Sequence, residues 1–370
     1  MHIHFFIGTK AQLIKMAPIM VELQQRGVAY RYVDSGQHIA TTYSLRQMFG
    51  LPEPNFMLRE ADQDIISISE ALRWYGGLLR RSLTDLHWLK NQVFPQGGIC
   101  LIHGDTLSTL LGLQLARRAG LQIAHVEAGL RSHRLFDPFP EELIRIHCMK
   151  RADLLFAPSN ESTENLRNMR VNGQVIPIGS NTVLDTLRLM ETCQPTIELP
   201  DTPFALATCH RLETISNRKR LAKVVALFNQ VAERIPLVLV IHGPTRRKLE
   251  HYGLSKQLLP QIKQQGLLDY GNFLLLQKRA SLVLSDGGSI QEECAALGKP
   301  CLILRNTTER PDGIGQNATL WQFDAAIAKR FLDNILLDKK HLGQVLSNSR
   351  PSAVIVDTLL RQSAAHHVRT

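Results

Sequence analysis

The sequence lacks the features that mark several protein classes. No run approaches the ~20 apolar residues of a membrane-spanning helix, and the start of the chain has no basic segment or small-residue cleavage site of a secretory signal. The six cysteines form no Cys-x-x-Cys pair, and no His-Glu-x-x-His motif occurs. We therefore expect a cytoplasmic protein with reduced cysteines, no bound metal and no membrane partner.

Aromatic residues are scarce as well. They make up 6% of the chain, which does not support a stacking platform for single-stranded nucleic acid. Lys and Arg outnumber Asp and Glu by 43 to 33, and the net charge of +10 favours anionic partners such as phosphate-bearing small molecules. Because the basic residues are dispersed, we expect a solvated basic surface and no nucleic-acid partner.

Short apolar runs alternate with longer amphipathic ones along the 370 residues, a length that favours two or three domains at ~150 residues each. Apolar residues spaced three and four apart predict helices over 15–25, 107–119 and 141–152. Strand and helix in alternation predict parallel sheets with crossover helices. The expected strands are 2–7, 30–34, 99–103, 123–126 and 154–157, then 175–178, 204–207, 237–241, 282–284 and 301–304.

The alternation restarts near residue 175, and the segment 190–203 carries three prolines, as a linker or loop does. We expect an α/β protein with two Rossmann-like, doubly wound domains that face a cleft. The first spans residues 1–175 and the second 176–350, while 351–370 form a helix that packs back on the first domain. Ligands of such sheets bind beyond the carboxyl ends of the strands.

Two motifs of the first half follow predicted strands. Gly8 precedes Lys10 and Lys15, and a glycine at a strand-to-helix turn either lets N–H groups approach an anion or makes a tight turn. Asp105 follows the strand that ends at His103, where an aspartate either projects into the site or caps the next helix. The local sequence leaves both alternatives open.

Two further acids lie at comparable places. Glu127 follows the strand 123–126, and Glu141 follows Pro140 at a predicted helix start, where an acid also complements the helix dipole. Such local explanations do not account for Asp105, Glu127 and Glu141 together in one domain. Carboxylates gathered at one edge of a sheet shift each other's pKa values and become candidate general acids and bases.

The second half offers two polar segments after strands. His210 and Arg211 follow the strand 204–207, where they suit phosphate binding or proton transfer, although a lone histidine is more often structural. The strand 282–284 leads into Gly287, Gly288 and Ser289 and then a helix, so the N–H groups of its first turn can bind a phosphate. An acid one turn later could hold ribose hydroxyls.

In this order the motifs resemble those of the bacterial UDP-N-acetylglucosamine 2-epimerase family, from Gly8 to about Pro311. The most specific segments are GDT at 104–106, HVEAGLR at 125–131, PFPEE at 138–142, CHR at 209–211, DGGSIQEE at 286–293 and TTERP at 307–311. The resemblance implies a two-domain fold of the glycosyltransferase-B type, a homodimer, a UDP-sugar substrate and no cofactor.

The resemblance also implies an activity and residue roles. The family's route eliminates UDP to give a 2-acetamidoglucal and returns UDP with protonation on the other face of C2, without metal or nicotinamide. The implied catalytic residues are Asp105, Glu127, Glu141 and His210. The implied substrate-binding residues are Lys10, Lys15, Arg145, Arg211, His242, Gly287, Gly288, Ser289, Glu293 and Arg310.

The sequence departs from the family's usual pattern at three positions. Lys10 replaces an arginine, Gly287 a serine and Ile144 an asparagine. A non-hydrolysing epimerase acting on UDP-N-acetylglucosamine or a related UDP-sugar is the leading hypothesis. The alternatives are a hydrolysing epimerase that releases UDP and N-acetylmannosamine, a glycosyltransferase that requires an acceptor, and an inactive nucleotide-sugar binder. Free UDP as a product distinguishes the hydrolysing enzyme.

Overall fold

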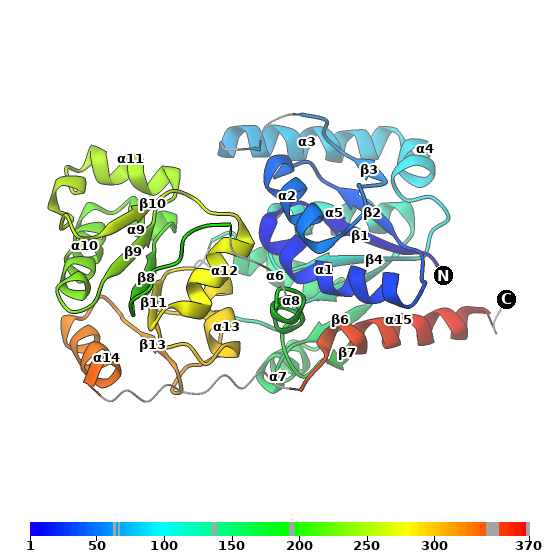
Figure 1. The fold of residues 1–370 in the computed structure, drawn as a ribbon. Helices are drawn as coiled ribbons and strands as arrows, with labels where there is room; N and C mark the ends of the chain where they lie inside the picture. The colour runs from blue at the N-terminus through cyan, green and yellow to red at the C-terminus, as the bar shows by residue number, and fades with distance from the viewer. Residues whose placement is uncertain (62–63, 66, 135–138, 192–195, 338–347, 368–370) are drawn as a thin grey trace. The chain divides into compact units, whose positions relative to one another are not determined.

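The computed structural model describes residues 1–61, 64–65, 67–134, 139–191, 196–337 and 348–367. The chain forms two compact units, which we describe separately (Figure 1). Unit 1 comprises Met1–Leu189 and Asn348–Thr370, and unit 2 comprises Met190–Ser347. Both units have a parallel sheet with helices between the strands, which confirms the predicted α/β doubly wound fold.

The sheet of unit 1 has seven parallel strands in the order β3-β2-β1-β4-β5-β6-β7. Every residue of β1 and β4 is buried, because helices cover both faces of the sheet. The strands are β1 (Ile3–Ile7), β2 (Arg31–Asp34), β3 (Phe56–Met57), β4 (Ile99–His103), β5 (Gln122–Val126), β6 (Leu154–Ala157) and β7 (Gln174–Pro177).

Polar caps set the starts of several helices in unit 1. The hydroxyls of Thr9 and Thr106 accept from the third N–H of α1 and α5, and Gly120 ends α5 in the left-handed conformation. The helices are α1 (Lys10–Gln25), α2 (Ile39–Phe49), α3 (Ile68–Thr84), α4 (Leu86–Trp88), the π-helical turn η1 (Leu89–Val93), α5 (Leu107–Ala119), α6 (Glu141–Met149), α7 (Asn160–Asn168), α8 (Val183–Leu189) and α15 (Pro351–His367).

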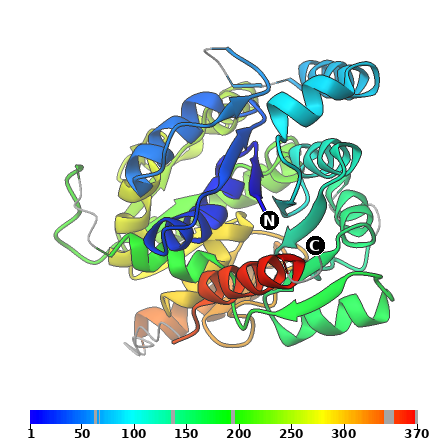
Figure 2. The same cartoon turned by 90° about the vertical axis from the view of Figure 1, so that its right-hand side faces the viewer.

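The C-terminal helix α15 belongs to unit 1, where it packs along α1 and α8 (Figure 2). The amino group of Met1 donates to Ser363 Oγ over 3.1 Å, and the N–H of Ser352 donates to Asp185 over 2.8 Å. The units divide after Leu189 rather than at residue 175, since β7 pairs with β6 in the first sheet and α8 packs on α1.

Unit 2 has a six-stranded parallel sheet in the order β10-β9-β8-β11-β12-β13, with an apolar cluster on each face. The strands are β8 (Ala205–Thr208), β9 (Leu237–Val240), β10 (Lys263–Gln265), β11 (Leu282–Ser285), β12 (Cys301–Ile303) and β13 (Ala318–Leu320). The helices are α9 (Leu212–Ile215), α10 (Arg218–Ala232), α11 (Gly243–His251), the 3-10 turn η2 (Ser255–Gln257), α12 (Tyr270–Arg279), α13 (Gly288–Ala296) and α14 (Ala325–Leu337).

The strand order determines where the loops after β1 and β4, and those after β8 and β11, leave the two sheets. In each sheet the order reverses at one point, between β1 and β4 in unit 1 and between β8 and β11 in unit 2. Loops after the two strands at such a switch point diverge and leave room for a ligand at the carboxyl edge. The segments 8–10 and 104–106 leave the sheet at the first switch point, and 209–211 and 286–288 at the second.

Candidate functional site

A buried carboxylate follows β5 in unit 1. Three groups converge on Oε2 of Glu127: Nζ of Lys15, in a short ion pair, Nδ2 of Asn181 at 2.6 Å and Nε2 of His103 at 3.6 Å. The Lys15 and Glu127 side chains are only 1% and 6% exposed. A buried ion pair needs further hydrogen bonds to offset the loss of hydration, and Asn181 supplies one.

The backbone of Glu127 is unusual. Its φ of +66° lies in the left-handed region, which costs a non-glycine residue about 1 kcal/mol or more. The neighbouring Gly129 has φ of +95°, and a Cβ there would lie 2.2 Å from the carbonyl oxygen of Ser162. The backbone of Glu127 therefore adopts a conformation that a glycine would adopt more easily. Because a glutamate occupies this position despite the cost, its carboxylate is a candidate functional group.

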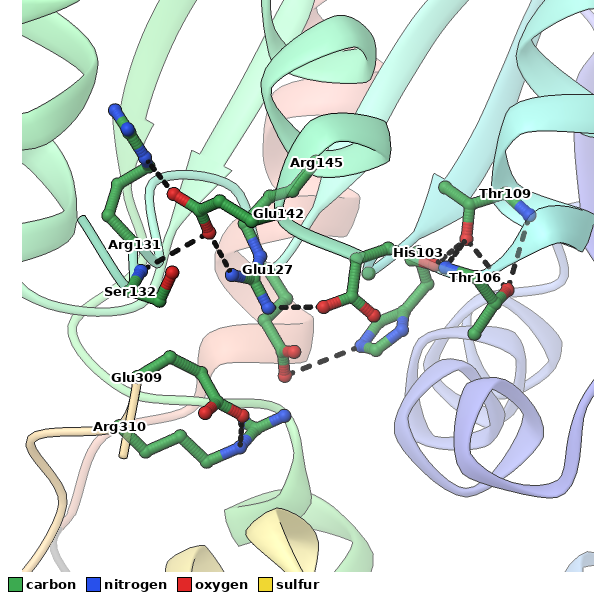
Figure 3. A network of polar contacts seen from close by, with 12 residues as sticks. His103, Thr106, Thr109, Glu127, Arg131, Ser132, Glu142, Arg145, Glu309 and Arg310 are labelled. Carbon is green, nitrogen blue, oxygen red and sulfur yellow. Dashed lines mark hydrogen bonds and ion pairs between the residues drawn. The ribbon is translucent and has the colours of Figure 1, made fainter. Parts of the chain in front are cut away.

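A second network joins the loop after β4 to helix α6 (Figure 3). Arg145 forms a short ion pair with Asp105 Oδ2, and its Nη1 donates to Glu142 Oε2 over 2.7 Å. Glu142 also accepts from Nε of Arg131 over 2.5 Å and from the N–H of Ser132 over 3.2 Å. Arg145 thus bridges two carboxylates, as Figure 3 shows.

Glu142 is wholly buried, and burial by itself raises the pKa of a carboxyl. The hydrogen bonds and charges of Arg131, Ser132 and Arg145 outweigh burial and lower the pKa of Glu142 below its usual value. Glu141, the predicted catalytic acid, is the half-buried first residue of α6 and precedes Glu142 directly. Glu142 is bonded to both Arg131 and Arg145.

The sequence left two alternatives open for Asp105 and two for Gly8, and the contacts around each residue bear on them. Thr106 caps α5, so Asp105 is left to pair with Arg145 instead of capping the helix. A Cβ at Gly8 would lie 2.2 Å from Ser35 Oγ and 2.5 Å from Ser108 Cβ, so close packing of these side chains accounts for this glycine. The N–H groups of Gly8 and Thr9 donate to Gln12 Oε1 over 2.8 and 3.1 Å, which engages the two groups that an anion would need.

Gln12 joins the two loops at the first switch point, and the predictions from sequence missed it. Its Nε2 donates to the carbonyl of His103 over 3.0 Å and to the hydroxyls of Thr106 and Thr109 over 3.1 and 2.9 Å. Lys10 lies beside it as the half-buried first residue of α1. Gln12 stands three residues after Thr9, the capping-box spacing, and that signal could have found it.

In unit 2 the register of β8 and β11 brings Thr208 opposite Ser285, so the residues that follow both strands meet. Oδ2 of Asp286 accepts from Cys209 Sγ over 3.1 Å and from the N–H groups of His210 and Arg211 over 3.0 and 2.9 Å. Nδ1 of His210 lies 3.3 Å from Asp286 Oδ1. Asp286 has no exposed surface, whereas the His210 side chain is 40% exposed.

The start of α13 lies against an arginine. A Cβ at Gly288 would lie 2.4 Å from Nε of Arg310, so only glycine admits the guanidinium at this distance. Arg310 also forms a short ion pair with the buried Glu292. Gly287 caps α13 without a side chain, and Ser289 lies half-buried in its first turn. A cation beside the N–H groups of a helix start is suited to bind a phosphate.

Arg310 is one of three arginines that lie around the buried carboxylate of Glu309. Glu309 lies 3.0 Å from Arg305 and 3.7 Å from both Arg211 and Arg310, the last pair marked in Figure 3. Burial raises the pKa of Glu309, but these three cations outweigh it and lower the pKa to about 2. The carboxylate therefore stays charged and holds the three cations on one side of the site.

Two other predicted residues of unit 2 have local partners. Glu293 is buried, and its Oε1 accepts from the hydroxyl of Tyr270 over 3.0 Å. Burial and the charge of Glu293 raise the pKa of Tyr270 well above its usual value, so the phenol remains a donor. His242 caps α11 by its backbone, and its ring centre lies 6.1 Å from that of His210.

Within the ranges that the structure describes, no three His, Cys, Asp or Glu side chains are arranged to hold a metal ion. The same residues include no helix of the length and apolarity required to cross a bilayer.

Sequence comparison places these residues in a known family. The family model described as UDP-N-acetylglucosamine 2-epimerase matches residues 21–351. A protein of that name from Bacillus subtilis is 31% identical over 83% of this chain and 79% of its own. The UDP-2,3-diacetamido-2,3-dideoxy-D-glucuronate 2-epimerase of Pseudomonas aeruginosa is 31% identical over 84% of each chain.

Structural comparison agrees. The UDP-GlcNAc 2-epimerase of Neisseria meningitidis, solved bound to UDP-GlcNAc, superposes with a TM-score of 0.82 at 27% identity. The match covers 98% of this chain and all of the Neisseria chain. The two-domain α/β architecture predicted from the sequence is therefore that of solved nucleotide-sugar enzymes.

Proposed function

The chain belongs to the UDP-N-acetylglucosamine 2-epimerase family, and on that premise we propose that it is a non-hydrolysing epimerase. It interconverts UDP-N-acetylglucosamine and UDP-N-acetylmannosamine, or a related UDP-sugar. The route eliminates UDP to a 2-acetamidoglucal and then adds UDP back. The proton returns to the opposite face of C2, and the reaction as proposed uses no cofactor.

Unit 1 supplies the groups that this chemistry needs around the sugar. Loss of the hydrogen at C2 needs a base, and its return needs an acid on the other face. We assign these roles to Asp105, Glu127 and Glu141. Two of them, Asp105 and Glu127, face the cations Arg145 and Lys15, which hold the carboxylates in fixed positions.

Unit 2 supplies the groups that this chemistry needs around the nucleotide. Arg310 and the N–H groups at the start of α13 can stabilise the charge that develops on the leaving diphosphate. His210 and Arg211 extend that positive region after β8. Glu293 is the acid that we assign to the ribose hydroxyls, and its bond from Tyr270 fixes the carboxyl.

One observation carries the proposal. The Glu127 carboxylate is buried, ion-paired and hydrogen-bonded on a backbone at φ +66°. A cap or a surface acid requires none of this, because it gains its stabilisation from one N–H and water. Strain that surrounding contacts hold in place is typical of catalytic positions, and Glu127 lies in HVEAGLR, one of the six segments that carry the resemblance to the family.

The test is NMR of the purified protein with UDP-N-acetylglucosamine in D₂O, following sugar and phosphorus signals together. We expect deuterium at C2 and the appearance of UDP-N-acetylmannosamine without accumulation of UDP. The variant Glu127→Gln, with nearly the same shape, should lose the exchange and still bind UDP. Deuterium together with free UDP would replace the proposal by the hydrolysing reaction. Binding without exchange, both for this substrate and for the diacetamido-glucuronate nucleotide discussed next, would refute it.

A second substrate has specific support. The Pseudomonas relative named for UDP-2,3-diacetamido-2,3-dideoxy-D-glucuronate is as identical to this chain as the Bacillus relative, at 31%. The same NMR experiment with that nucleotide sugar decides between them by the ratio of the two kcat/KM values. A ratio above ~100 for either substrate corresponds to about 2.7 kcal/mol of transition-state discrimination.

Two coarser properties belong to the proposal. A cytoplasmic location is supported by five free cysteines in the described part of the chain, all of them buried thiols. A homodimer is supported by α3, where Leu72 and Leu83 are 57% and 58% exposed. Sedimentation of the wild type beside Leu72→Glu should show a dimer that the charged variant weakens, and a wild-type monomer would remove this part of the proposal.

A further inference from the structure

Asp286 is a fully buried carboxylate at the start of the loop after β11. Its oxygens accept from the N–H groups of His210 and Arg211 and from the thiol of Cys209. In the described ranges, His210 is the one group capable of positive charge within 4.0 Å of these oxygens. A buried carboxylate is costly unless it is paired, so its arrangement next to a histidine requires an explanation.

The two oxygens of Asp286 have different sets of hydrogen-bond donors. The two N–H groups and the thiol all reach Oδ2, at 3.0, 2.9 and 3.1 Å. Burial and the Asp286 charge raise the pKa of Cys209 well above its usual value, so the thiol stays a donor instead of becoming a competing anion. Oδ1 shares the N–H of His210, which donates to it over 3.1 Å, and it is the oxygen that faces the imidazole, with Nδ1 at 3.3 Å.

Nδ1 of His210 and the rest of its ring therefore lie in different surroundings. Nδ1 faces a buried acceptor, which favours a proton on that nitrogen, because an acceptor opposite a lone pair would be repelled. The 40% exposure of the side chain leaves the rest of the ring accessible. Gly287 contributes to this access, since a Cβ there would lie 3.2 Å from His210 Cε1 and lean on the ring.

We propose that Asp286 is a positioning residue for the reaction: it holds the proton of neutral His210 on Nδ1 and so presents Nε2 to the substrate. When the ring is protonated, Nε2–H donates to an oxygen of the departing diphosphate, and Asp286 balances the charge of the imidazolium. When the ring is neutral, Nε2 accepts. The role of His210 toward the diphosphate rests on the proposed function, but the placement of the proton does not.

The variant Asp286→Asn tests this with little change of shape. The amide oxygen can take the place of Oδ2 and accept from Cys209, His210 and Arg211 as before. The amide NH₂ then takes the place of Oδ1, gives up the shared bond from the N–H of His210, which the amide oxygen still accepts, and donates to Nδ1. The neutral ring of His210 must then carry its proton on Nε2, which can no longer accept one.

The tautomer is read by long-range ¹H–¹⁵N NMR on protein labelled with ¹⁵N-histidine, with His210→Gln to assign the signal among the 14 histidines. We expect the Nδ1–H form in the wild type and the Nε2–H form in Asp286→Asn. Turnover of UDP-N-acetylglucosamine by the variant should fall at least ~100-fold in kcat, the usual contribution of a positioned acid–base group, with KM changed less than ~3-fold.

The control is Cys209→Ala, which removes one donor from Asp286 and keeps the carboxylate. It should leave the proton of His210 on Nδ1. An Nε2–H form in the wild type would overturn the proposal even if Asp286→Asn failed to fold. A changed tautomer with unchanged kcat would overturn the role in the reaction. Because the tautomer is read without substrate, a wild type that does not epimerise would refute the proposed function and leave this result standing.

Discussion

Removing both members of the Lys15–Glu127 pair should destabilise unit 1 by much less than the sum of the two single removals. Lys15→Met removes the cation beside the carboxylate in a site where the side chains are 1% and 6% exposed, and Glu127→Gln removes the anion beside the ammonium. Breaking a buried pair from one side costs ~3–5 kcal/mol. The double variant leaves no charge, so its cost should be below the sum of the two single costs by about 2–4 kcal/mol.

These energies translate into measurable shifts. Unit 1 falls in the size range where each kcal/mol lowers Tm by ~2–4 °C, so each single variant should lose about 6–20 °C. Tryptophan fluorescence can follow unit 1 alone, because Trp74 and Trp88 lie in it and the third tryptophan, Trp321, is in unit 2. All variants are therefore made in a Trp321→Phe background, and urea unfolding gives the free energies.

The same helix provides a matched control. Arg26 and Glu22 pair on the exposed side of α1 at 2.7 Å, with side chains 30% and 25% exposed. Arg26→Met and Glu22→Gln should each cost no more than ~1 kcal/mol, because water screens both charges. If the Lys15 and Glu127 variants cost as little as these, or if the double variant costs the sum of the singles, the buried pair does not act as a unit and the reasoning fails.

Three further predictions use other parts of the two units. Gly288→Ala should lower the affinity for UDP at least ~10-fold by calorimetry, since the new Cβ displaces Arg310, whereas Gly266→Ala, with open space around it, should bind as the wild type does. Glu309, with its pKa lowered to about 2, stabilises the fold above pH 4.5. Its advantage over Glu309→Gln in unfolding free energy should vanish as pH falls from 4.5 through 2, and a pH-independent difference would contradict this. Glu142→Gln should lose about 3 kcal/mol of stability and most of kcat/KM, because Glu142 holds Arg145, the partner of Asp105, and full activity would show that turnover does not need this bond.

Hydrophobic runs predicted the long, buried strands of both sheets but missed the short ones. The strands β3, β10 and β13 have only two or three residues each, and β3 and β10 contain no fully buried side chain. So few residues carry no detectable period, and each of these strands forms by pairing with the strand before it, β2, β9 or β12. The motifs identified the family correctly, because six short segments in register are far more specific than any single one.

The site was predicted residue by residue, and the pairs within it were not. Lys15 and Glu127 are 112 positions apart, and Cys209 and Asp286 are 77 apart. Sequence distance says nothing about such contacts until strand order is known. Glu142 was missed for a different reason: it adjoins Glu141 on α6, and which of two adjacent acids faces Arg145 depends on how the helix is rotated.

Each unit has a buried carboxylate directly after a strand, but the residue that the carboxylate faces differs between the two units. Glu127 follows β5, Asp286 follows β11, and both carboxylates are buried at the carboxyl edge of a parallel sheet. The partner then decides the chemistry. Glu127 faces the ammonium of Lys15, whereas Asp286 faces the imidazole of His210. Under the proposed function, an ammonium suits a carboxylate that we assign to a fixed place beside the sugar. An imidazole, the side chain type that most readily exchanges protons near neutral pH, suits a position that we assign to the departing and returning diphosphate.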